Sequence, residues 1–222
     1  MINTKECLGE AIKLVLEHKR QIDRELWEGI HLNTLGIRKG DSSKENLWKW
    51  FTLAVGPGWR AGPAPSLDRR KNMIKEFDRW YEKVTSKILS KYSGQVAMDK
   101  MIEELVKIKG IGSKIAGVYL RDIVYHFEVW PQLKEYLYLP IDRHTKNILV
   151  HKLKAFDENH APAVGESYFT KKNRCFQENL SQIHKPRVEF DYFWTIGSKF
   201  CSFYLCSFCW IKEVCRVKSP IL

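Results

Sequence analysis

The stretch that decides the fold is LVKIKGIGSKIAG, residues 105–117. An apolar helix ends here, two glycines separated by one residue turn the chain, and a second helix starts. Glycine tolerates positive φ and leaves the backbone N–H groups of the turn uncovered. The second helix begins at this turn, so its free N–H groups and the positive end of its dipole point outward. We therefore expect either a hairpin that binds a DNA phosphate or an ordinary αα-hairpin.

Helical periodicity continues on both sides of this hairpin. Asp41-Ser42-Ser43 predicts an N-cap, followed by a helix through residues 47–54 that must end at Gly56. The other predicted helices cover residues 4–30, 68–89, 98–108, 115–127 and 142–153. The polar stretch 154–187 is ambiguous, and no run alternates with period 2 for long enough to form a sheet. We expect the all-α class.

The composition limits the function classes. The 222 residues include 37 Lys and Arg against 26 Asp and Glu, a formal net charge of +11. This surplus favours a polyanionic partner, usually nucleic acid. No stretch approaches the ~20 apolar residues that span a bilayer, and the first twenty residues lack a signal-peptide pattern. Membrane, secreted and fibrous proteins are not expected.

Four of the six cysteines lie within fifteen residues near the end of the chain, with the spacing C-x4-C-x2-C-x5-C. These are Cys201, Cys206, Cys209 and Cys215. Without export signals a disulfide framework is not expected, and four neighbouring thiolates suit a metal centre. The alternatives are an iron–sulfur cluster, a tetrahedral zinc site and four buried free thiols. The intervening residues are apolar, which favours a cluster shielded from water.

Lys114 and Asp142 could act together at a sugar. Lys114 lies just inside the helix that follows the glycine turn, and Asp142 begins the helix that starts in LPIDRHT, residues 139–145. A neutral lysine is a nucleophile able to form a Schiff base at C1′. A carboxylate can stabilise the cationic sugar that develops as a base leaves. Each residue also has a structural alternative, a solvated charge for the lysine and an N-cap for the aspartate.

The motifs IKGIGSK (residues 108–114) and IDRH (residues 141–144) resemble the helix-hairpin-helix, Gly/Pro-Asp motif of the endonuclease III-like DNA glycosylase superfamily. The terminal cysteines resemble the [4Fe-4S] loop of that family. The resemblance implies a fold of two helical domains. A barrel with the hairpin would cover residues 30–138, and residues 1–29 plus 139–222 would form a terminal domain with the cluster.

The resemblance also implies roles for individual residues. Lys114 takes the place of the Schiff-base lysine of bifunctional members, and Asp142 that of the catalytic aspartate. Candidate contacts to the DNA backbone are Lys109, Gly110, Gly112 and Ser113. The loop GPGWRAGPAP (residues 56–65) lies where the family wedges side chains into the duplex, so Trp59 and Arg60 are candidates. Cys201, Cys206, Cys209 and Cys215 would bind the cluster.

Three departures from the family pattern affect the expectations. The hairpin has Lys109-Gly110 where the family usually has Pro-Gly, and the added lysine suits a further phosphate contact. The first cysteine gap has four residues where the family usually has six, and Ser-Phe-Tyr-Leu stands here in place of the basic residues that the family's loop carries toward DNA. The interval between Lys114 and Asp142 is longer than usual.

These observations lead to one expected function and two alternatives. We expect a base-excision-repair glycosylase that removes a damaged, oxidised base from duplex DNA and then cleaves the abasic site. The alternatives are a glycosylase without lyase activity and a DNA-binding protein without catalysis. The expected partner is duplex DNA with a damaged base or an abasic site. We also expect a monomer inside the cell, either cytoplasmic and nucleoid-associated or nuclear.

Overall fold

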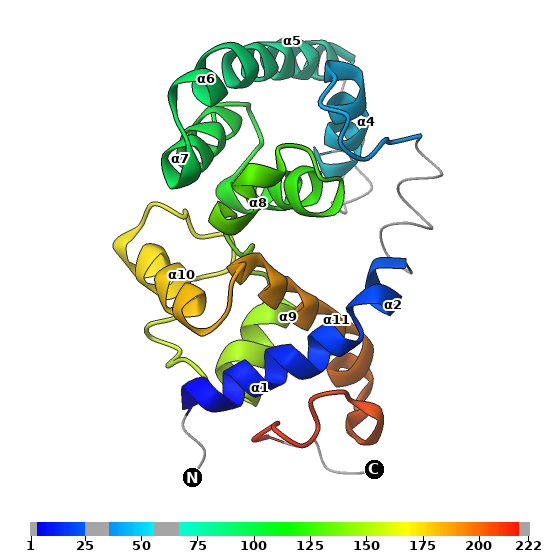
Figure 1. Ribbon diagram of the computed structural model, residues 1–222, viewed down its shortest axis with the longest axis vertical. Helices are drawn as coiled ribbons and strands as arrows, with labels where there is room; N and C mark the ends of the chain where they lie inside the picture. The colour runs from blue at the N-terminus through cyan, green and yellow to red at the C-terminus, as the bar shows by residue number, and fades with distance from the viewer. Residues whose placement is uncertain (1–3, 25–35, 56–66, 218–222) are drawn as a thin grey trace. The chain divides into compact units, whose positions relative to one another are not determined.

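The computed structural model describes residues 4–24, 36–55 and 67–217, and these residues form helices, turns and loops without any strand (Figure 1). The expected all-α class is confirmed for this part of the chain. The chain divides into two compact units, which we call the terminal unit (Met1–Glu28 and Tyr138–Leu222) and the central unit (Gly29–Leu137). Each boundary falls one residue before the one expected from the sequence. No helix in the described ranges has the length and apolar character needed to cross a membrane.

The central unit contains α4 to α8, joined by short π and 3-10 segments. The α-helices are α4 (Lys44–Val55), α5 (Leu67–Lys83), α6 (Leu89–Lys91), α7 (Gly94–Leu105) and α8 (Ser113–Arg121). The other segments are the π-helical Val84–Ile88 and Asp122–His126 and the 3-10 helix Pro131–Tyr136. Because Val84–Ile88 joins α5 to α6, residues 67–91 continue as one long helix, as the sequence predicts.

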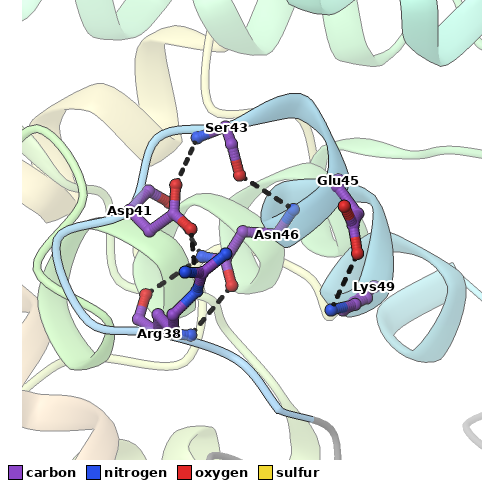
Figure 2. Close-up of polar contacts among 6 residues, drawn as sticks. All are labelled: Arg38, Asp41, Ser43, Glu45, Asn46 and Lys49. Atoms are coloured by element: carbon purple, nitrogen blue, oxygen red, sulfur yellow. Dashed lines mark hydrogen bonds and ion pairs between the residues drawn. The ribbon is translucent and has the colours of Figure 1, made fainter.

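A network of polar contacts fixes the start of α4 (Figure 2). Ser43 is the N-cap, because its hydroxyl accepts a hydrogen bond from the Asn46 amide at 3.3 Å. The buried Asn46 side chain donates to the carbonyls of Arg38 at 3.0 Å and Asp41 at 2.8 Å. The Ser43 amide donates to the Asp41 carboxylate at 2.8 Å and lowers the pKa of that group. The expected N-cap region is confirmed.

Aromatic side chains form the core of the central unit. Phe51 of α4 packs on Phe77 of α5 and Tyr119 of α8, with ring centroids 4.7 and 5.4 Å apart. The Tyr119 hydroxyl donates to the Leu47 carbonyl at 3.1 Å, and burial raises the pKa of Tyr119 well above its ordinary value. Offset and edge-to-face contacts of this kind stabilise a core beyond the area they bury. They hold α8, the second helix of the glycine hairpin, against α4 and α5.

A buried ion pair lies at the end of α8, and a hydrogen bond from Trp50 ties it to α4. The side chain of Asp122, directly after α8, accepts hydrogen bonds from Trp50 Nε1 at 3.0 Å and Arg121 Nε at 2.7 Å. All three side chains are buried. Buried charges are tolerated where they are paired and hydrogen-bonded, so this group fixes the end of α8.

The terminal unit combines both ends of the chain. Its α-helices are α1 (Thr4–Glu17), α2 (Lys19–Asp23), α9 (Arg143–Lys146), α10 (Lys171–Ile183) and α11 (Phe193–Thr195). Two π-helical segments, Asn147–Lys152 and Ile196–Phe200, continue α9 and α11. The 3-10 helices are Arg187–Tyr192, Cys201–Phe203 and Cys206–Phe208. In Figure 1 the cysteine segment is the red loop that follows α11.

Polar contacts hold α2 to the segment before α11. Glu189 is nearly buried and accepts from Lys19 Nζ at 3.0 Å. His184 Nε2 lies 2.6 Å from the other oxygen of the same carboxylate. Tyr192 donates its hydroxyl to Asp23 at 2.6 Å. Helix α2 is thereby tied to the region that leads into the cysteines.

Candidate functional site

The glycine hairpin has a buried base and an exposed tip. Ile108 and Ile111 are buried, and the Ile111 amide donates to the Ile108 carbonyl at 2.9 Å, which closes the turn. Gly110 has φ +95°, a conformation that side chains rarely adopt. Lys109, Gly110 and Gly112 are exposed. The two isoleucines anchor the turn while the residues between and after them face outward.

The start of α8 has no side-chain cap. Its N-cap is Gly112, with extended backbone at φ −92° and ψ 170°, and the first turn contains no acidic residue. The starts of α4, α9 and α10 are instead capped by Ser43, Asp142 and Thr170. A Cβ on Gly112 would meet nothing within 4 Å, so the approach to these amides is open. The amides and the helix dipole together favour an anion here.

Lys109 and Lys114 project from this hairpin without forming an ion pair with any described residue. Lys114 is the second residue of α8 and is partly exposed, and Ser113 before it is also partly exposed. Lys107 differs, because its amine pairs with Glu104. The hairpin therefore presents two unpaired cations beside its amides.

Glu104 braces the first helix of the hairpin. Its carboxylate also accepts from Lys83 Nζ at 2.8 Å, so one acid joins α5, the end of α7 and the turn. Burial of Glu104 raises its pKa, but the hydrogen bonds from Lys107 and Lys83 outweigh burial and lower the pKa overall. The Glu104 carboxylate is therefore ionised at neutral pH.

Asp142 is the N-cap of α9. Its Oδ1 accepts a hydrogen bond from the Thr145 amide at 2.7 Å, while the side chain stays partly exposed. The Thr145 hydroxyl is buried and has no hydrogen-bond partner among the described residues. The cap fixes the carboxylate at the first turn of α9, and one carboxylate oxygen is left for another partner.

A close approach of two helices holds α9 in place. A Cβ built on Gly197 would lie 2.7 Å from the Cβ and 3.1 Å from the Cα of His144, closer than side chains tolerate. His144 also makes an edge-to-face contact with Trp194, at 6.1 Å between ring centroids. His144 therefore contributes to the packing between α9 and the segment Ile196–Phe200. Gly197 was not singled out from the sequence, although a glycine inside a helical pattern often marks such an approach.

The two expected catalytic residues belong to different units of the chain. Lys114 belongs to the central unit and Asp142 belongs to the terminal unit. Trp59 and Arg60 lie outside the described residues.

The cysteine loop surrounds one hollow of about 360 Å³, counted to its open mouth, in the terminal unit. Cys201, Cys206, Cys209 and Cys215 all line it, together with Ile148, Lys152, Phe200, Ile211, Lys212 and Val217. All six cysteines of the chain are free thiols. Sulfur is the one kind of metal donor in this lining, which contains neither a carboxylate nor an imidazole. Within the described ranges no three His, Cys, Asp or Glu side chains converge to hold a single metal ion.

Burial and mutual repulsion keep two of these thiols protonated. Burial raises the pKa of Cys209 to about 11, and the other three thiols of the loop add to the rise. Burial also raises the pKa of Cys201, although the Lys152 amine opposes it. The spacing of the cysteines predicted that they would lie together. The sequence did not predict that Lys152 would lie beside them, because it belongs to the distant segment after α9.

Three contacts hold the cysteine loop in place. Trp210 stacks on His18 at 4.2 Å between ring centroids. Cys7 Sγ donates to the Val214 carbonyl at 3.4 Å, and the Arg216 amide donates to the Lys152 carbonyl at 3.1 Å.

The expected wrapping of the hollow by apolar residues of the loop is only partly correct. Phe203 and Phe208 are 68% and 72% exposed, and Tyr204 and Leu205 also face solvent. Because the cysteines occupy the inner side of two short 3-10 turns, the residues between them lie on the outer side. The apolar lining comes instead from Ile148, Phe200, Ile211 and Val217.

Comparisons of the chain with protein-family models, with curated proteins and with solved structures found no match.

Proposed function

We propose that this protein is a bifunctional DNA glycosylase that removes a damaged base from duplex DNA and cleaves the resulting abasic site. The observation that carries the proposal is the hairpin. It combines exposed glycines, an uncapped start of α8 and an unpaired lysine as the second residue of that helix. The net charge of +11 supports a polyanionic partner. The damaged base is proposed to be oxidised.

The hairpin contacts the DNA backbone and makes no contact with the edges of the bases. Backbone amides at Gly112 and Ser113 receive a phosphate, with the α8 dipole and Lys109 adding attraction. Such contacts fix where the backbone lies relative to Lys114. The target nucleotide then leaves the stack, because its C1′ is inaccessible within a duplex.

Lys114 is the proposed nucleophile. Its unprotonated amine donates an electron pair to C1′ while the damaged base leaves with the electrons of the N-glycosidic bond. The sugar ring opens as the amine and C1′ form a Schiff base. Loss of a C2′ proton then expels the 3′ phosphate, which nicks the strand, and water hydrolyses the Schiff base to free the lysine.

Asp142 is the proposed electrostatic partner. The sugar gains positive charge as the base leaves, and a carboxylate aimed at that charge stabilises the transition state. The Thr145 amide holds Oδ1 of Asp142 at 2.7 Å, which fixes the orientation of the side chain. A fixed carboxylate needs no reorganisation when the charge develops.

We further propose that the cysteine loop binds a [4Fe-4S] cluster. Four sulfur donors line this hollow, and within the described residues no three of them converge on one point. This arrangement fits a cluster of several atoms better than one zinc ion, which needs its ligands to converge on a point. Cys201, Cys206, Cys209 and Cys215 would hold it. When bound, it braces the C-terminal segment against α1 and the segment after α9.

The remaining parts of the proposal follow from the substrate. The protein acts on damaged duplex DNA as a monomer and works where chromosomal DNA is found, in a nucleoid-containing cytoplasm or a nucleus.

The proposal is tested with a panel of labelled duplexes, each with one oxidised base or one abasic site. We expect base release and, without added alkali, a nick at the lesion. Lys114→Gln should abolish the nick, whereas Lys87→Gln, an exposed lysine distant from the hairpin in sequence, should leave it intact.

The alternatives give different results on the same panel. Base release that produces nicks only after alkali treatment indicates a glycosylase without lyase activity. Binding without base release on every duplex indicates a protein that recognises DNA without catalysis. Either result contradicts the proposed bifunctional activity.

A further inference from the structure

A second surface of the central unit has the properties of an anion site. A hollow of about 1500 Å³, counted to its open mouth, lies between α5 and the tip of the glycine hairpin. Its lining consists of Asn72, Met73, Lys75, Glu76, Arg79, Lys109 and Gly110. The hairpin residues Lys109 and Gly110 thus form one wall, and a single face of α5 forms the other.

The cations of this hollow are unpaired. The side chains of Lys75, Arg79 and Lys109 form no ion pair or hydrogen bond with any other described residue. Several other basic residues of the central unit have acidic partners, such as Lys44 with Asp78 at 3.2 Å and Lys83 with Glu104 at 2.8 Å. One acid, Glu76, lines the hollow, so the local charge is positive. Exposed cations gathered without partners create a field that attracts a polyanion.

The buried opposite face of α5 fixes the direction in which the side chains of Lys75 and Arg79 point. Phe77 and Trp80 are buried in the core, and Trp80 Nε1 donates to the Met101 carbonyl at 3.2 Å. The helix therefore cannot rotate without exposing its aromatic face. Lys75 and Arg79 are four residues apart, which places them on one face about 6 Å apart along the helix axis. The phosphates of one DNA strand follow each other about 3.4 Å apart along the duplex axis, so the two cations span roughly two nucleotides.

We propose that this hollow binds the phosphate backbone of DNA and that α5 is a second contact for the strand held by the hairpin. Lys75 and Arg79 neutralise phosphates next to the one received at the start of α8, and Lys109 connects the two contacts. Glu76 weakens the interaction and limits non-specific affinity. The inference rests on the proposed function for its choice of DNA as the polyanion, but it requires no catalytic step.

DNA fits the hollow better than an acidic peptide does. Phosphate groups are favoured by the backbone amides of a helix start as well as by lysine and arginine. Lys109 lines the hollow and lies close in sequence to Gly112, the N-cap of α8. A regular row of charges also matches cations that repeat at one helical turn. An acidic peptide remains the competing occupant in the test.

The experiment measures equilibrium binding of the full chain to a fluorescent 20-base-pair duplex over a range of salt concentrations. Two duplexes are used, one undamaged and one with a tetrahydrofuran abasic analogue that the protein cannot cleave. We expect Lys75→Ala and Arg79→Ala each to weaken binding to both duplexes by up to about eightfold at 0.1 M salt. Each should also reduce the slope of log K against log salt by about 0.9.

Two further variants make the result specific. Glu76→Gln should tighten binding, an opposite effect that a folding defect cannot produce. Lys87→Ala removes an exposed lysine from the same long helix outside the hollow and should leave affinity and slope unchanged. Unchanged binding in the Lys75 and Arg79 variants overturns the inference. An equal loss in the Lys87 variant, or displacement of DNA by polyglutamate at matched charge, overturns it as well.

This outcome is separable from that of the proposed function. If the wild type binds both duplexes through α5 but neither releases a base nor nicks a strand on the panel of oxidised and abasic duplexes, the glycosylase proposal fails and the inference stands. If catalysis is observed and the α5 variants bind normally, the inference fails alone.

Discussion

Asp142 has two roles at the residue scale that one substitution can separate. It caps α9 through the Thr145 amide, and it is the carboxylate proposed to act at the sugar. Asparagine caps a helix about as well as aspartate but carries no charge. The two amino acids therefore differ mainly in the proposed chemistry.

We predict that Asp142→Asn lowers base release about 10²–10³-fold, as the loss of a fixed electrostatic partner does elsewhere. The free energy of unfolding should change by no more than about 0.5 kcal/mol. Asp142→Ala is the control for the cap and should lose about 1 kcal/mol of stability. Chemical denaturation and a base-release assay measure the two effects. An Asn variant with normal base release would remove Asp142 from the mechanism.

Glu104 makes the stability of the hairpin dependent on pH. Its folded-state pKa lies below the ordinary value of 4.5 because Lys107 and Lys83 outweigh the effect of burial. A lowered pKa means that the carboxylate contributes its full stability above pH 4.5, and that this contribution is lost as pH falls through the folded-state pKa.

We predict that Glu104→Gln lowers the free energy of unfolding at pH 7 by up to about 1 kcal/mol, since both lysines are substantially exposed. The difference between wild type and variant should shrink as pH falls below 4.5. Urea denaturation from pH 3 to 7 measures it. A difference that stays constant over this range would mean that the ion pairs do not stabilise the fold.

At the scale of elements, the approach of Ile196–Phe200 to α9 depends on Gly197. Gly197→Ala should destabilise the protein by about 1–3 kcal/mol, because the new methyl group overlaps His144. It should also lower base release, since α9 carries Asp142 at its start. Thermal unfolding and the base-release assay measure both effects.

Gly9 provides the matched control. It lies inside α1, and a Cβ there would meet its nearest atom, in Ile183, at an ordinary 3.9 Å. Gly9→Ala should stabilise the protein by about 0.5–1 kcal/mol through helix propensity. Equal tolerance of alanine at both glycines would contradict the close helix approach.

A substitution in the cysteine loop tests the proposed iron–sulfur cluster. Cys209→Ser should lose bound iron, lose absorbance near ~400 nm and lower the melting temperature, because the loop would lose its central brace. Cys175 is exposed on α10 and outside the loop, so Cys175→Ser is the control and should keep all three properties. Stoichiometric zinc in a colourless wild-type protein would contradict the cluster.

Helix α10 shows where sequence patterns were insufficient. The stretch 154–187 gave no clear prediction, yet α10 (Lys171–Ile183) forms behind the Thr170 cap. Its buried face contains two polar residues, Asn173 and Gln177, which hide the apolar periodicity. Gln177 pairs with the Leu139 amide and carbonyl at 2.9 and 3.0 Å, and such distant partners cannot be deduced from local sequence.

At the scale of the whole molecule, the predictable features were those set by local chemistry. The glycines predicted the turn before α8, and Gly56 predicted the end of α4 at Val55. The grouping of the cysteines followed from their spacing. The orientation of Phe203 and Phe208 did not, because it depends on which side of a short turn faces the hollow. The unpaired cations Lys75 and Arg79 on α5 were also not predicted, because tertiary structure decides whether a charged side chain has a partner.

The measurement that tests the central claim most directly is borohydride trapping on the abasic and oxidised duplexes, followed by peptide mapping of the adduct. The account predicts a covalent protein–DNA adduct at Lys114 that is absent from Lys114→Gln and retained in Lys87→Gln. An adduct at another residue, or no adduct on any duplex that the protein binds, would contradict a Schiff base at Lys114 and with it the proposed bifunctional mechanism.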